Sequence, residues 1–154
     1  MQQLDKILEY KNEDVICRFT DLLNVTDDEA EDIFLETKKF LFLSQYEGIF
    51  IPDELLILDE MWHNFILFTR EYAAFCQANF GRFVHHQPAT RAEKLNRKAA
   101  IEANPEANRA EFNKKLEVLI SAVFDHLGQE TVLKWFSTYP QIYSPQNIKD
   151  LRKA

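Results

Sequence analysis

Charged and ionisable residues interrupt an apolar stretch of sequence between Leu58 and Pro88. Asp59 and His63 are four residues apart, so on a helix their side chains lie about 40° apart on one face. A carboxylate and an imidazole at this spacing can bind one metal ion. They can also hydrogen-bond to each other and hold the imidazole in a single tautomer, and the spacing leaves both interpretations open.

A third metal ligand is available in the histidine pair His85 and His86, which follows this stretch. Adjacent residues of an extended segment point to opposite sides, so one histidine of the pair is expected to face the helix and the other to face away. Two imidazoles and one carboxylate, with coordination positions left open, suit Zn²⁺, Fe²⁺ or Mn²⁺. The sequence therefore predicts a divalent-metal site made of Asp59, His63 and one of these two histidines.

Arg70 extends the polar stripe, because it follows His63 by seven residues and lies roughly 20° to the other side of it on a helix. In one interpretation Arg70 pairs with an acidic residue of a neighbouring helix. In the other, the ion activates water or dioxygen, and Arg70 is the catalytic residue that orients an anionic substrate.

A single long helix over residues 54–79 is expected to position the stripe. Apolar side chains surround the stripe on almost every side, which is typical of a helix buried at the centre of a domain. Asp53 is placed to cap the start of this helix, and Gly81 to end it.

The whole composition predicts an all-α protein: one domain over residues 1–154, a bundle of seven or so helices around the 54–79 helix. Only 3 Gly and 5 Pro stand against 13 Phe, and 46% of the residues are hydrophobic. Capping residues mark several helix starts, at Thr26 with Glu29 three residues later, at Thr90 and at Ser144. Residues 91–109 are polar and helix-prone, which indicates a mobile or protruding helix.

The net charge of −7 limits the possible partners. An acidic surface repels phosphates, so direct nucleic-acid binding is not expected. No apolar run spans a membrane and the first residues lack the apolar core of a signal peptide, so a cytoplasmic protein is expected.

Besides an unknown small molecule, the sequence leaves a basic protein partner open. In that competing hypothesis the chain is a non-enzymatic interaction or inhibitor module, and its acidic contacts come from Asp27, Asp28, Glu29, Glu31 and Asp32. The oligomeric state is left open.

The same stretch resembles the signature region of the glycine-rich-domain-containing protein-like family. The matching positions are Asp59, Trp62, His63, Ile66, Thr69, Tyr72, Cys76, Gly81, His85, His86 and Pro88. The chain is similar to the short bacterial single-domain members and lacks the glycine-rich tail of the larger plant members. The resemblance implies a helical domain with a special Asp-His-His constellation, and it supplies no reaction.

Overall fold

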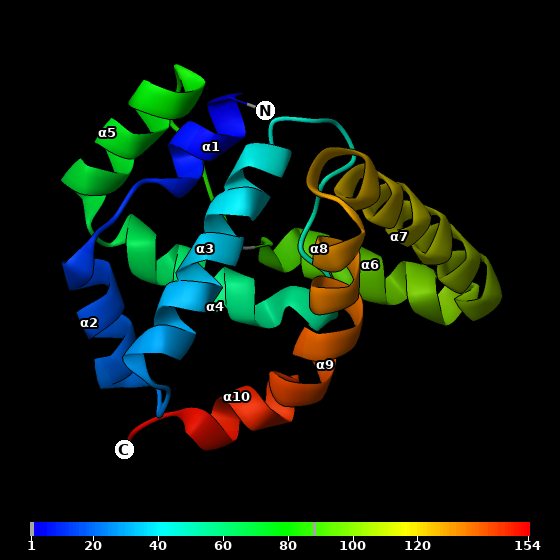
Figure 1. The fold of residues 1–154 in the computed structure, drawn as a ribbon. Coiled ribbons are helices and arrows are strands. Elements are labelled where there is room, and N and C mark those ends of the chain that lie inside the picture. Colours follow the sequence, from blue (N-terminus) through cyan, green and yellow to red (C-terminus); the bar gives the residue numbers. More distant parts are fainter. Residues whose placement is uncertain (1, 88) are drawn as a thin grey trace.

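The computed structural model describes residues 2–87 and 89–154, and the regular structure of these residues is helical (Figure 1). In chain order the helices are α1 (Gln2–Leu8), α2 (Glu13–Leu22), α3 (Asp27–Leu43), α4 (Leu56–Ile66), α5 (Thr69–Phe80), α6 (Arg91–Ala103), α7 (Pro105–Leu127), α8 (Gln129–Leu133), α9 (Tyr139–Ile142) and α10 (Pro145–Leu151). A 3₁₀ turn at Asp53–Leu55 leads into α4, and a π-helical turn at Lys134–Thr138 joins α8 to α9. The described residues contain no β-strand, which confirms the predicted all-α class.

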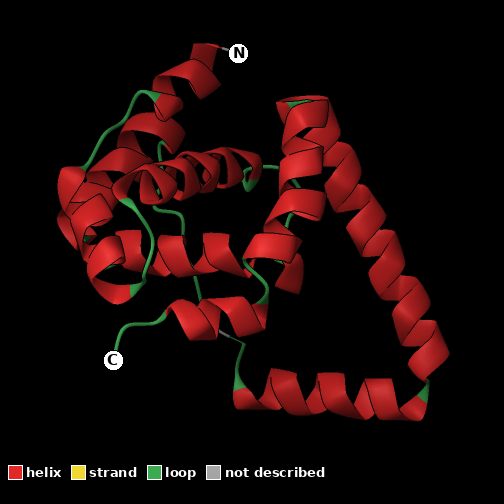
Figure 2. Cartoon of the chain, turned by 60° about the horizontal axis from the view of Figure 1, so that its bottom comes forward, coloured by secondary structure: helices red, strands yellow, loops and turns green. Residues whose placement is uncertain are grey.

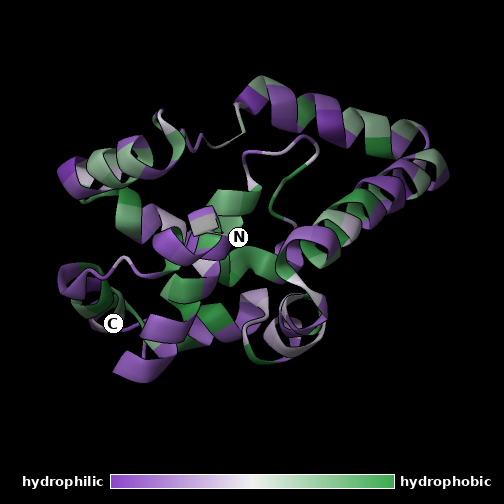
Figure 3. Ribbon diagram, turned by 45° about the horizontal axis from the view of Figure 1, so that its top comes forward, coloured by the Kyte–Doolittle hydropathy of each residue, from purple (hydrophilic) through white to green (hydrophobic). Residues whose placement is uncertain are grey.

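Helices α3 and α4 cross in the middle of the molecule and contribute many of its buried side chains (Figure 1). Ile33 and Leu41 of α3 and Leu58 and Phe65 of α4 are fully buried. Helices α1 and α2 pack against α3, and α2 also contacts α4. Figure 3 shows hydrophobic residues gathered in this middle region. Two crossing helices, and not one central helix, therefore organise the core.

The prediction of one continuous helix over residues 54–79 is wrong. Helix α4 ends at Ile66 and α5 begins at Thr69, with Leu67 and Phe68 between them. Phe68 has φ −85° and ψ 68°, which lies outside the helical region. The chain therefore changes direction at a point where the helical pattern of apolar residues in the sequence continues without interruption.

Contacts between aromatic rings explain this break. The ring centroid of Phe65 lies 5.0 Å from that of Tyr72 and 5.2 Å from that of Phe75. Residues seven apart on a straight helix are separated by about 10 Å along its axis, which is too far for such contacts. The break allows α5 to fold back so that the three rings pack edge to face, an arrangement that aromatic pairs prefer.

Local capping signals in the sequence are confirmed. The Thr26 side chain accepts a hydrogen bond from the Glu29 backbone at 3.1 Å, and the Glu29 side chain accepts one from the Thr26 backbone at 2.9 Å. Thr90 and Ser144 cap α6 and α10 in the same way, through backbone N–H groups three residues later. Asp53 is an exception, because it lies inside the 3₁₀ turn and forms no side-chain cap there.

Helices α6 and α7 form an arm that extends from the rest of the molecule (Figure 2). None of the α6 side chains is buried, and α6 packs mainly against α7. This agrees with the polar sequence of residues 91–109, since a helix with few apolar residues gains little from packing on a core. None of the helices in the described part of the chain has the length and the hydrophobicity that crossing a membrane requires.

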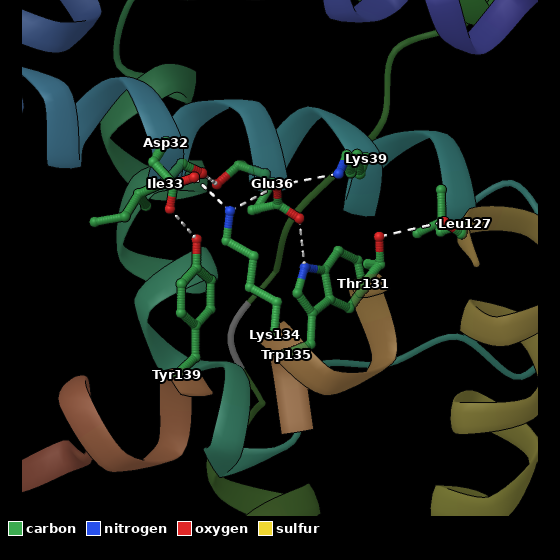
Figure 4. A network of polar contacts seen from close by, with 10 residues as sticks. Asp32, Ile33, Glu36, Lys39, Leu127, Thr131, Lys134, Trp135 and Tyr139 are labelled. Atoms are coloured by element: carbon green, nitrogen blue, oxygen red, sulfur yellow. Dashed lines mark hydrogen bonds and ion pairs between the residues drawn. The ribbon is translucent and has the colours of Figure 1, made fainter. Parts of the chain in front are cut away.

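A buried polar network fixes the C-terminal helices against α3 (Figure 4). Lys134 forms ion pairs with both Asp32 and Glu36. The indole of Trp135 donates a hydrogen bond to Glu36 at 2.9 Å, and the hydroxyl of Tyr139 donates one to Asp32 at 2.9 Å. Glu36 is only 1% exposed, so its charge depends on these partners. The sequence pattern gave no indication of this network, because its members are about a hundred residues apart.

Candidate metal centre

Three of the predicted ligands come together between α4 and the segment that follows α5. Asp59 and His63 lie one turn apart on α4, as the four-residue spacing predicted. Oδ1 of Asp59 lies 2.7 Å from Nε2 of His86, and Oδ2 of Asp59 lies 3.6 Å from Nδ1 of His63. The two imidazole rings are stacked with centroids 4.4 Å apart. One ligand atom from each residue lies within 4.8 Å of the other two.

The separations of the Asp59 oxygens from the two imidazoles are close to, although not within, those found around a single small cation. Two donor atoms that each lie about 2.1 Å from one ion are roughly 3.0 to 3.4 Å apart at octahedral or tetrahedral angles. The observed separations of 2.7 and 3.6 Å lie on either side of that range. The alternative of a direct hydrogen bond between Asp59 and His63 is not supported, because 3.6 Å is too long for one.

His86 provides a second indication of a cation. Its Nε2 is buried and has no hydrogen-bond partner among the described residues, although Asp59 is only 2.7 Å away. The contact therefore lacks the direction of a hydrogen bond. Two electron-rich atoms this close repel each other unless a positive charge lies near both. A metal ion to the side of the contact would supply such a charge to both atoms.

A chain of buried contacts holds His86 in place. The His86 ring stacks on the indole of Trp62, with centroids 4.0 Å apart and planes 7° apart. The Trp62 indole donates a hydrogen bond to the Tyr72 hydroxyl at 2.9 Å, and that hydroxyl donates one to the Val84 carbonyl at 2.5 Å. Burial raises the pKa of Tyr72 well above its ordinary value, so its hydroxyl keeps the proton that it donates. Such outer contacts orient metal ligands and adjust their affinity.

The sequence did not identify Trp62 and Tyr72 as positioning residues. They were expected only as part of the apolar surface around the stripe, and their spacing on a straight helix would keep them about 15 Å apart. The break between α4 and α5 is what brings them into contact. An indole or phenol near a predicted histidine site, with a polar group that needs a buried partner, is a signal that the sequence offered.

Of the two adjacent histidines, the structure places His86 beside Asp59 and His63. Gly81 has φ 70°, a left-handed conformation that glycine adopts without strain, and it ends α5. In the segment beyond it Val84 is buried, His85 is exposed and His86 is mostly buried. The ring of His85 lies 4.7 Å from that of Phe83 and outside the ligand group. His85 is therefore not brought to the centre.

Arg70 is not brought to the centre either. It lies at the start of α5, beyond the break, and its side chain is exposed. The predicted stripe assumed a continuous helix, and the change of direction at Leu67 and Phe68 removes Arg70 from the face that carries His63. Arg18 and Arg152 instead line a small recess of about 180 Å³ on one side of His63. No sequence pattern indicated these two arginines, which come from opposite ends of the chain.

A larger groove opens at the centre itself. It has a volume of about 440 Å³, and Asp59, His63 and His86 all line it. His63 is the most accessible of the three ligands, with 55% of its side chain exposed. A metal ion held by these residues is therefore open to solvent and to a small molecule.

A comparison with family models shows which family the chain belongs to. The model described as UCP032817-like matches residues 12–104, which is more than half of the chain and includes every residue of the candidate centre. The chain belongs to the UCP032817-like family. The resemblance to the glycine-rich-domain-containing protein-like family is thereby corrected, since the matching stretch lies wholly inside the UCP032817-like match.

Neither the curated proteins nor the solved structures include a match to this chain. The UCP032817-like description names no activity, so family membership supplies neither a metal nor a reaction. Any functional interpretation depends on the geometry of Asp59, His63 and His86.

Proposed function

We propose that the protein binds one divalent transition-metal ion, Zn²⁺, Fe²⁺ or Mn²⁺, through Asp59, His63 and His86. The observation that carries this proposal is the buried Nε2 of His86, which lies 2.7 Å from a carboxylate oxygen without forming a hydrogen bond. The donor set supports it, because imidazole and carboxylate groups are ligands that these three ions accept.

The proposed centre is suited to catalysis on a small molecule. Three protein ligands leave coordination positions open, and an ion bound there would lower the pKa of a bound water or bind dioxygen. Asp59 and the two imidazoles would hold the ion, while the stack of His86 on Trp62 would keep the ligand set from rotating away. A small metal-dependent enzyme of the cytoplasm is therefore the function that we favour.

The competing role is an acidic module that binds a basic protein. Part of the acidic surface that would serve this role is engaged inside the molecule. Glu29 caps the start of α3, and Asp32 contacts both Lys134 and Tyr139. Fewer carboxylates are therefore available to a partner than the sequence suggested, which supports the metal-binding proposal over this alternative.

Metal content tests the proposal directly. We expect protein purified without added metal to contain nearly one equivalent of zinc, iron or manganese by elemental analysis. His86→Ala should lose this metal, whereas His85→Ala, the same change at the neighbouring position, should keep it. Comparing these two variants distinguishes the loss of a ligand from a general disturbance of the segment.

Thermal unfolding provides a second readout. A chelated sample supplied with an ion at about 100 times its dissociation constant should gain about 2.7 kcal/mol in unfolding free energy. For a chain of this size that gain raises the melting temperature by roughly 5 to 10 °C. Absence of bound metal after purification, together with no shift for any of the three ions, would reject the proposal.

A further inference from the structure

The groove at the candidate centre is lined largely by apolar side chains. The three candidate ligands line it together with the polar residues Ser44, Asp53 and Gln87. Apolar side chains from α3, the loop before α4, and α4 itself also line it: Phe40, Ile49, Phe50, Ile51, Pro52 and Leu56. Its volume of about 440 Å³ falls within the usual range for small-molecule sites, which are mostly apolar with a few polar groups at one end.

The protein side chains that line this groove do not favour an anionic occupant. No lysine or arginine occurs among the described residues that line it, and its acidic residues are Asp53 and Asp59. With Asp59 bound to the ion, Asp53 would still repel a phosphate or a second carboxylate. Arg18 and Arg152 are the cationic side chains near His63, and they line the separate recess of about 180 Å³.

From these walls and charges we propose that the groove binds a small uncharged molecule with an aromatic or aliphatic body and an oxygen donor at one end. The body lies against the apolar walls near Ile51 and Leu56, and the donor reaches the ion held by Asp59, His63 and His86. This inference rests on the proposed metal binding and adds the class of substrate. It also replaces the expectation of an anionic substrate oriented by Arg70.

Hydroxamic acids of different size test the inference, because they are uncharged in neutral solution and share one metal-binding group, which releases its proton to the solvent on binding the ion. We expect zinc- or manganese-loaded protein to bind benzohydroxamate at least tenfold more tightly than acetohydroxamate in calorimetric titrations, and inorganic phosphate more weakly than either. Ile51→Ala should reduce the tenfold preference at least threefold and leave the affinity for the ion unchanged. Leu67→Ala, which alters the recess beside Arg18, should preserve the preference.

The possible results separate the two proposals. Equal affinity for the two hydroxamates, or phosphate binding as tight as that of benzohydroxamate, overturns the inference about the groove and leaves the metal site standing. A preference that is lost in Leu67→Ala and kept in Ile51→Ala also overturns it, because the ligand then occupies the other recess. Failure to take up any ion refutes the metal-binding function, and the inference fails with it.

Discussion

Replacing Tyr72 with phenylalanine tests whether buried hydrogen bonds hold the segment that carries His86. The Tyr72 hydroxyl accepts from the Trp62 indole at 2.9 Å and donates to the Val84 carbonyl at 2.5 Å. Phenylalanine keeps the ring in its edge contact with Phe65 but leaves a buried donor and a buried acceptor without partners. Each such group costs about 1–3 kcal/mol, so Tyr72→Phe should lower the unfolding free energy by roughly 2–6 kcal/mol.

The same change should weaken metal binding, because His86 loses part of its support. Loss of an outer contact of a metal ligand typically costs 10- to 100-fold in affinity, roughly the decrease that we expect here. Urea unfolding of the metal-free protein measures the first effect, and competition with a coloured chelator measures the second.

Tyr46→Phe is the matched control, since the Tyr46 side chain is exposed and its hydroxyl should contribute little. If Tyr72→Phe unfolds within about 0.5 kcal/mol of the wild-type protein, the proposed role of the hydroxyl is refuted.

Three further changes probe the fold. Burial lowers the pKa of Lys38 from its ordinary 10.5 to about 8. Between these pH values the unfolded chain binds more protons than the folded protein. The unfolding free energy should therefore rise with pH across that window, by up to roughly 3 kcal/mol. Unfolding free energies of Lys38→Met at pH 8 and pH 9.5 should lack this rise. Glu36→Gln should cost about 3 kcal/mol in urea unfolding because it weakens a buried ion pair, whereas the exposed Glu31→Gln should change stability little. Gly81→Ala should cost about 1 kcal/mol and lower the melting temperature by roughly 2–4 °C, since its φ of 70° strains any side chain.

Much of the helical structure was predictable because it depends on neighbours in the chain. Thr26, Thr90 and Ser144 each satisfy a backbone N–H three residues later, and such a bond forms wherever the local sequence allows it. The placement of Asp59 and His63 on one face has the same origin, because the helical repeat fixes it. The choice within the histidine pair was predictable only as an alternation.

The remaining features required the packed molecule. The break before Thr69 brings Phe65 into contact with Tyr72 and Phe75, which one continuous helix would hold too far apart. That break removes Arg70 from the stripe and brings Tyr72 to Trp62, so it decides which residues belong to the candidate centre.

The sequence by itself determined the helical class, the caps and the pair of candidate ligands on α4, since all of these arise from interactions within a few residues. Only the tertiary structure decided that His86 joins this candidate group, that Arg70 lies outside it, and that Glu36 pairs with Lys134. These outcomes depend on contacts between segments far apart in the chain, whose energies are set by how the helices pack and not by any local pattern.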